Sequence, residues 1–169
     1  MDFYEIVKTR RSVRKYKPTP VETEKIDRIL EAVRLAPSAK NLQPWHFILI
    51  QDPAVKTALK EAYPRDWFHT APVIICACGE TSKGWVRRDG KSYLDVDLAI
   101  AFEHLVLAAT AEGLGTCWIG AFDAPAVKRV LGLPEGVEPI AMTPLGYADG
   151  AAPASSRKNL AEILRRDRW

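Results

Sequence analysis

The stretch from Ser92 to Glu112 is the longest helical candidate in this chain, and its apolar residues lie on nearly every side of the predicted helix. Ser92, with Asp95 three residues later, predicts the N-terminal cap, and Gly113 predicts the end of the helix. A helix that is apolar all round must be buried in a core or against a partner chain. Acidic residues interrupt the run that a bilayer span of about 20 residues would need, so we expect no membrane helix.

Shorter elements alternate on both sides of this segment. Apolar spacing predicts a helix from Phe3 to Arg10, and Thr19-Pro20-Val21-Glu22 predicts the start of a second helix that Pro37 stops. Short apolar runs predict buried strands at 46–50 and 72–78 and further strands at 116–119 and 139–147. Pro144 predicts a bulge or an edge in the last strand. With helices expected at 53–62, 124–131 and 160–166, the pattern predicts a sheet flanked by helices.

Length and composition limit the organisation of the chain. A chain of 169 residues with 47% hydrophobic content predicts one domain over residues 1–169. The three cysteines, Cys76, Cys78 and Cys117, lack zinc-ligand spacing, which favours a reducing compartment and packing roles. Residues 1–5 do not begin a secretory signal, so we expect a cytoplasmic protein.

A basic cluster follows the first predicted helix, in the segment Arg10-Arg11-Ser12-Val13-Arg14-Lys15-Tyr16. Arginine side chains match phosphate oxygens bidentately, and Ser12 adds a hydroxyl group to the same segment. Taken alone, the cluster favours a solvated basic face or a loose nucleic-acid patch. The net charge of 24 − 21 = +3 is too small for a general polyanion partner, so a local phosphate ligand fits better than a duplex.

Further segments change this interpretation when they are taken in order with the basic cluster. They are residues 36–47 (APSAKNLQPWHF), 113–122 (GLGTCWIGAF), 145–147 (LGY) and the pair Arg157-Lys158. Each segment is a weak signal alone, but their order and spacing are specific. Together they resemble the flavin-binding signatures of the nitroreductase family.

The resemblance implies a fold, an assembly and a cofactor. The fold is an α+β sandwich whose central sheet is flanked by helices, in an intertwined homodimer with flavin mononucleotide (FMN) at each of two subunit interfaces. By motif position, the residues that bind the phosphate, the ribityl chain and part of the ring are Arg10, Arg11, Ser12 and Arg14, joined at the phosphate by Arg157. The other subunit contributes Pro37, Ser38, Ala39 and Asn41, and the backbone at Gly120 and Ala121 lies beside the flavin N5.

Two points about this site can be argued from the residues themselves. Glycine followed by alanine after an apolar strand lets the backbone approach a flat ring closely, although close packing of a strand on a helix explains Gly120-Ala121 equally well. Cationic groups near a flavin also stabilise the negative charge of its reduced form. One departure from the family concerns the pyrimidine edge of the flavin, where Arg65 is the candidate replacement for the usual amide or basic side chain.

Most other distinctive residues have a structural explanation. The three histidines are isolated in sequence, and Cys76 and Cys78 share one face of a strand, so packing roles are expected. No dinucleotide fingerprint or Walker loop is present, so a nicotinamide cofactor would visit the flavin only transiently. Residues 79–90 have the composition of a mobile loop. They form either a plain linker or a lid in which Trp85 stacks on flat aromatic acceptors.

The sequence therefore predicts an FMN-dependent oxidoreductase with ping-pong chemistry. NADH or NADPH reduces the flavin, and an electron-poor acceptor such as a nitroaromatic or a quinone then takes its place. No catalytic acid or base is predicted, because the cofactor carries the chemistry. The alternatives are another flavin reaction of the family (dehalogenation, flavin fragmentation or azoline oxidation), a flavin-binding protein without turnover, and a small nucleic-acid-binding module. The oxidoreductase interpretation includes no nucleic-acid or membrane partner.

Overall fold

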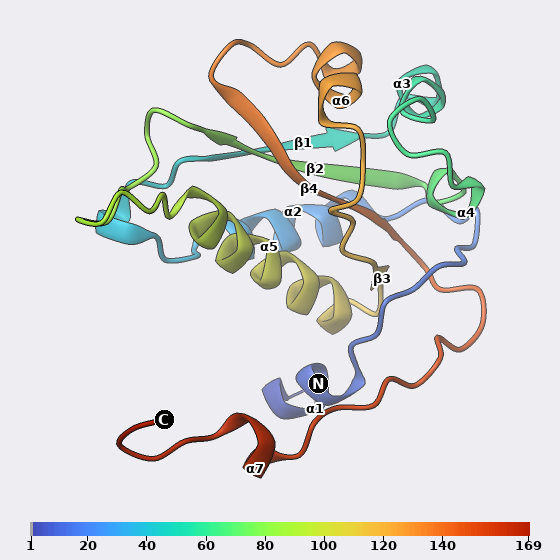
Figure 1. Cartoon of the computed structure of the whole chain (residues 1–169). Helices are drawn as coiled ribbons and strands as arrows, with labels where there is room; N and C mark the ends of the chain where they lie inside the picture. Colours follow the sequence, from blue (N-terminus) through green and yellow to red (C-terminus); the bar gives the residue numbers. More distant parts are fainter. Residues whose placement is uncertain (1) are drawn as a thin grey trace.

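The computed structural model describes residues 2–169, and its centre is a four-stranded sheet with the order β1-β2-β4-β3 (Figure 1). The strands are β1 (Trp45–Ile50), β2 (Val73–Glu80), β3 (Gly115–Thr116) and β4 (Val137–Gly146). Each neighbouring pair is antiparallel. β2 lies between β1 and β4 and is buried over nearly its whole length, which explains its continuous apolar sequence.

Helices cover both faces of this sheet. In Figure 1, α2 (Thr23–Arg34) and α5 (Leu94–Ala111) lie below the sheet, and α3 (Pro53–Ala58) and α6 (Ala124–Leu131) lie above it. The shorter elements are α1 (Phe3–Thr9), the 3₁₀ turn η1 (Ala39–Asn41), α4 (Asp66–His69) and α7 (Leu160–Ile163). The predicted α+β architecture is confirmed. Among residues 2–169, no helix is long and apolar enough to cross a membrane.

The core consists of two layers, one on each face of β2. On one face, Ile75 packs with Phe102 and Leu105 of α5 and Ile29 of α2. On the other face, Ile74, Cys76 and Cys78 pack toward α6 and α4. Burial of a large apolar side chain contributes about 1.5–3 kcal/mol, so these layers dominate stability.

The three cysteines behave as predicted. All are buried free thiols, and the Sγ atoms of Cys76 and Cys78 lie 3.6 Å apart on the same face of β2. They belong to the core, and the cytoplasmic location remains a prediction.

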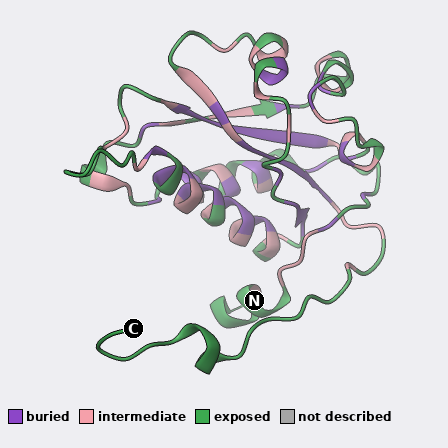
Figure 2. Ribbon diagram, viewed as in Figure 1, coloured by how far each residue is buried: buried purple, intermediate pink, exposed green. Residues whose placement is uncertain are grey.

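Helix α5 is only partly covered by its own chain. Its buried face includes Leu98, Phe102 and Leu105, but Val96 stays 38% exposed. Neither α1 nor the C-terminal tail packs tightly over α5. Figure 2 shows α1 and the C-terminal tail as exposed elements, and Phe3, Tyr4 and Val7 of α1 lie in solvent.

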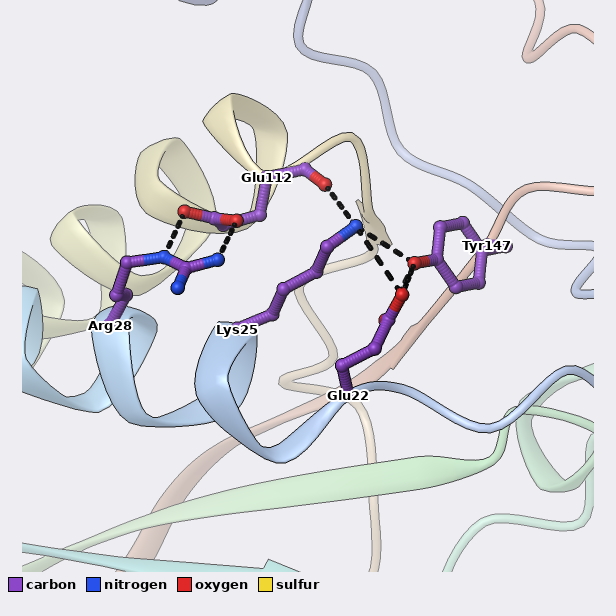
Figure 3. A network of polar contacts seen from close by, with 5 residues as sticks. All are labelled: Glu22, Lys25, Arg28, Glu112 and Tyr147. Carbon is purple, nitrogen blue, oxygen red and sulfur yellow. Dashed lines mark hydrogen bonds and ion pairs between the residues drawn. The ribbon is translucent and has the colours of Figure 1, made fainter.

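A polar network joins the start of α2, the end of α5 and the end of β4 (Figure 3). The Tyr147 hydroxyl donates to the Glu22 carboxylate at 2.6 Å. Lys25 Nζ donates to the Tyr147 hydroxyl at 2.8 Å and to the Glu112 carbonyl at 3.1 Å, so it satisfies a carbonyl at the end of α5. Arg28 binds the Glu112 carboxylate bidentately at 2.7 and 2.8 Å. The network fixes the point where the chain leaves α5 for β3.

This network explains one wrong prediction, the start of the second helix. α2 begins at Thr23 with Glu22 in the N-cap position, rather than with an N-cap at Thr19. The Glu22 side chain makes no cap hydrogen bond because it is engaged by Tyr147, a residue remote in sequence.

Four other predictions are corrected. β1 is an edge strand with half-exposed residues, not a fully buried one. Pro144 forms no bulge, because it pairs in register with Ile74, and the bulge of β4 lies beside Pro139, since Ala77 pairs with Ala141 and Cys78 with Pro139. The alternative of an edge fits Pro144, because the pairing with β3 ends at Leu145. The strand predicted at 116–119 shortens to β3, because Cys117 N donates to the Thr143 hydroxyl instead of to a strand carbonyl. The tail helix covers only Leu160–Ile163.

Two segments remote in sequence lie side by side at β3. Val13 N donates to the Thr116 carbonyl at 2.8 Å, and Ser12 forms a parallel bridge with Thr116. A Cβ atom at Gly115 would lie 2.6 Å from Val13 Cγ2, which is too close for any side chain. Glycine at this position therefore lets the basic segment run along the edge of the sheet.

We predict that Gly115→Ala lowers the free energy of unfolding by about 1–3 kcal/mol, because the new methyl group displaces Val13 from the sheet edge. Gly120→Ala is the matched control, since a Cβ there would meet only Trp118 Nε1, at 3.9 Å. Urea denaturation of both variants measures the difference. Equal stability of Gly115→Ala and the wild type would contradict this account of the close contact.

Candidate functional site

The basic segment runs past the end of α1, and its Lys15 pairs with Asp149 at 2.6 Å, whereas its arginines make other contacts. Arg11 Nη1 donates to the carbonyls of Lys8 and Arg10, both at 2.7 Å, and so caps the end of α1. Among residues 2–169, no carboxylate forms a salt bridge with Arg10, Arg11 or Arg14. Burial raises the pKa of Glu103 and the charge of Arg10 lowers it, so Arg10 lies near that carboxyl group. Guanidinium groups that are not held in a salt bridge are suited to an anionic ligand.

Arg10, Ser12 and Arg14 act on a common point, the thiol of Cys117. Burial raises the pKa of Cys117, while the charge of Arg14, the Ser12 side chain and the charge of Arg10 lower it. Because the charges of Arg14 and Arg10 lower the pKa of Cys117, both guanidinium groups lie near this buried thiol. A pocket of about 190 Å³ is lined by Val13, Arg14 and residues 149–153, and another of about 200 Å³ is lined by Arg10, Arg11 and Gly115 among others. The segment therefore borders hollows on the surface rather than a flat face.

Gly120 and Ala121 follow the β3 region and are both exposed. A Cβ atom at Gly120 would contact only Trp118 Nε1, at an ordinary 3.9 Å, so close strand-to-helix packing does not explain glycine at this position. Backbone at this point is accessible to a flat ligand.

Trp118 is a residue that the sequence analysis did not select. It is 42% exposed, and its ring packs against Phe102 of α5 with centroids 4.2 Å apart. The sequence signal that could have identified Trp118 is its position, as an aromatic residue two positions before Gly120. It offers an apolar surface beside the backbone of Gly120.

The segment after Pro37 forms a strained turn. Lys40, Asn41 and Gln43 have φ values of 52°, 55° and 48°, and none of them is glycine. Each left-handed non-glycine residue costs on the order of 1–3 kcal/mol, and such strain clusters at functional sites. Gln43 N donates to Ser38 Oγ at 2.9 Å, which closes the turn.

This turn and the basic segment lie at different ends of α5. Ala39 N donates to Asp97 in the first turn of α5, whereas Arg10 and Arg11 share a pocket with Thr110 near its last turn. Thirteen residues of helix separate these points by about 20 Å. Figure 1 shows η1 beside the start of α5 and β3 near its end. Within one chain, the predicted cofactor residues therefore form two separate groups.

Arg65 and Arg157 lie outside the basic segment and the turn of residues 38–43. Arg65 stands at the N-cap of α4, and Trp67 of that helix packs with Val13 and Tyr16, so α4 adjoins the basic segment. Arg157 lies in the exposed tail, where its Nη1 donates to the Ser156 carbonyl.

The segment with Trp85 is more ordered than its composition predicted. Val86 forms an antiparallel bridge with Ser92, and Arg87 pairs with Asp89 at 2.5 Å. The Trp85 ring packs edge-on against Tyr93, with centroids 4.9 Å apart. This hairpin leads directly into the start of α5, and therefore lies with the turn of residues 38–43 rather than with the basic segment.

Comparison with known proteins identifies the family of this chain. The sequence model of the Nitroreductase family matches residues 7–64 and 60–147. The chain belongs to the nitroreductase family. This membership makes it an oxidoreductase.

Solved structures and a curated relative extend the similarity over almost the whole chain. A nitroreductase family protein from Clostridium difficile 630 superposes with a TM-score of 0.92 at 32% identity, covering 100% of both chains. An FMN-dependent nitroreductase from Clostridium difficile R20291 gives a TM-score of 0.84 at 28% identity, covering 97% of this chain and 98% of that one. An NADH dehydrogenase of Thermus thermophilus is 31% identical over 194 residues, covering 92% of this chain and 91% of that protein.

The chemistry of these residues fits the phosphate and the ring of FMN. Unpaired arginines can hold a phosphate, and open backbone at Gly120 can accept a ring. No group of three or more histidine, cysteine or acidic residues within 2–169 could hold a metal ion.

We predict that Arg14→Ala raises the dissociation constant for FMN about 10- to 100-fold, because charge-assisted hydrogen bonds to a phosphate are lost. Arg157→Ala should also raise the dissociation constant for FMN. Lys17→Ala, an exposed cation of the same segment, is the matched control and should bind FMN normally. Titration of the apoproteins by flavin fluorescence measures all three. Undiminished affinity in both arginine variants would exclude this phosphate site.

Proposed function

We propose that this protein is an FMN-dependent oxidoreductase that uses NADH or NADPH to reduce electron-poor acceptors such as nitroaromatics or quinones, in a ping-pong sequence. The observation that carries the proposal is the group of arginines near Cys117 that form no salt bridge among residues 2–169, followed three residues after Cys117 in the chain by exposed backbone at Gly120. FMN would supply the hydride chemistry when bound. The name of the similar FMN-dependent nitroreductase supports the choice of cofactor.

The phosphate end of the cofactor belongs to the basic segment. Arg10, Arg11 and Arg14 supply guanidinium donors, and Ser12 supplies a hydroxyl group. Arg157 would join them from the tail, and Arg65 at the start of α4 would reach the pyrimidine edge. The same positive charges would stabilise the anionic reduced ring, so this segment would both bind the flavin and favour its reduced form.

The ring itself belongs to the exposed backbone at Gly120 and Ala121. A backbone N–H there can donate a hydrogen bond to the flavin N5 without a titrating side chain. Trp118 is held by Phe102 and adds an apolar surface that excludes water. No side chain in this group is placed to act as a general acid or base, so the residues bind and orient.

The assembly that we propose is a homodimer whose two cofactor sites each use both subunits. The two groups of predicted residues, about 20 Å apart along α5, do not form one pocket within a chain. A second copy can bring the turn with Pro37, Ser38, Ala39 and Asn41 to the basic segment of the first. The exposed apolar side chains of α1 and of the tail, including Phe3 and Leu160, fit a covered interface.

Other reactions of the family remain alternatives, because they use the same cofactor residues. A nucleic-acid-binding module is a different class. It would use the six basic residues from Lys8 to Lys17, bind more weakly as salt rises, and carry no chromophore.

The experiment that tests the proposal is the absorption spectrum of the purified protein, before and after addition of NADPH or NADH without oxygen. We expect a flavin spectrum that bleaches and then recovers on addition of menadione or a nitroaromatic. A colourless protein that FMN does not restore would contradict the proposal. A flavin that neither nucleotide bleaches would indicate binding without turnover.

The variant Trp85→Ala tests whether Trp85 stacks on flat aromatic acceptors. If it does, the variant should show a raised KM for these acceptors with unchanged FMN content.

A further inference from the structure

Asp97 is a buried acidic residue for which the core offers little compensation. It lies in the first turn of α5 and is 2% exposed. Its Oδ1 accepts the backbone N–H of Ala39 at 2.9 Å. Its Oδ2 is buried and has no hydrogen-bond partner within residues 2–169. A buried polar oxygen without a partner is unfavourable, although the start of a helix favours an acidic side chain.

The buried positions around Asp97 on α5 are apolar, namely Leu94, Leu98 and Ala101. An apolar residue would therefore suit this position better if packing were its purpose. What Asp97 adds is an acceptor aimed at one backbone N–H of another segment.

The segment that Asp97 holds is the strained turn of residues 38–43. Its internal hydrogen bonds run from Asn41 N to the Ser38 carbonyl and from Gln43 N to Ser38 Oγ, both at 2.9 Å. These bonds close the turn on itself but do not fix its position against α5. The bond from Ala39 to Asp97 supplies that connection. Left-handed non-glycine residues persist only where the surroundings hold them in place.

We propose that Asp97 is a positioning residue of the cofactor site. By accepting the Ala39 N–H, it holds the turn in the conformation that presents Ser38, Ala39 and Asn41 to the flavin. The proposal rests on the proposed function, since it assigns the turn to the cofactor. Asp97 acts through Ala39 and has no role in proton transfer.

Three variants test this proposal in the full-length protein. Asp97→Ala removes the acceptor, Asp97→Asn keeps an oxygen that can accept from Ala39, and Asp95→Asn changes an exposed acid in the same turn of α5 as a control. The measurements are the dissociation constant for FMN, the two-electron midpoint potential of the bound flavin and the melting temperature.

We expect Asp97→Ala to raise the dissociation constant at least about tenfold and to shift the potential, because a displaced turn changes the surroundings of the ring. Asp97→Asn should retain affinity within about threefold of the wild type, and Asp95→Asn should match it. A purely structural role would lower the melting temperature but leave the potential unchanged. Equal affinity and potential in Asp97→Ala and the wild type would overturn the proposal, as would equal loss in Asp97→Ala and Asp97→Asn.

Amide hydrogen exchange covers the case in which Asp97→Ala does not fold. In the wild type and in Asp97→Asn, the Ala39 N–H should exchange slowly, since it is hydrogen-bonded to a buried side chain. Exchange as fast as in an unstructured peptide would overturn the proposal. Wild-type protein that binds no FMN would instead refute the proposed function, and this assignment with it.

Discussion

The burial of α5 against α2 and the sheet is the constraint on which the rest of this structure depends. Phe102 and Leu105 are almost fully buried, so the helix cannot move without opening the core. Each end of this fixed helix then positions one of the two segments that we assign to the cofactor. Asp97 at its start holds the turn of residues 38–43, and the Lys25–Glu112 contact at its end fixes the path into β3. The separation of the two segments therefore follows from the length of a buried helix.

The candidate site offers positive charge and exposed backbone. Arginines that form no salt bridge within the described residues lie near the Cys117 thiol, and exposed backbone at Gly120 follows three residues later in the chain. Such a surface would suit a cofactor that carries its own chemistry, as the proposed function requires. This explains how one fold serves several flavin reactions, and why the residues that bind the cofactor do not identify the acceptor.

Much of this architecture was predictable from the sequence, and the exceptions have physical reasons. The boundaries of α6 were predicted as observed, because Asp123, a proline and Gly132 mark its ends locally. The start of α2 was not, because Glu22 is engaged by Tyr147, which lies 125 residues away in sequence. The bulge beside Pro139 depends on register with β2, which no local pattern encodes. For the site, motif order located the basic segment, whereas the open space at Gly120 and the anchoring role of Asp97 required the three-dimensional arrangement.

The central claim is that each cofactor site is built from two chains, and a hybrid dimer tests it most directly. One chain carries Arg14→Ala, and the other carries Ser38→Ala with Asn41→Gly, so that each homodimer has two defective sites. Two different affinity tags allow the heterodimer to be isolated and its bound flavin measured by absorbance. If the sites are shared between subunits, both defects fall in one site and the other is intact, which predicts about one FMN per heterodimer. A heterodimer that is isolated with as little FMN as the two homodimers would show that each site lies within a single chain and would contradict this account.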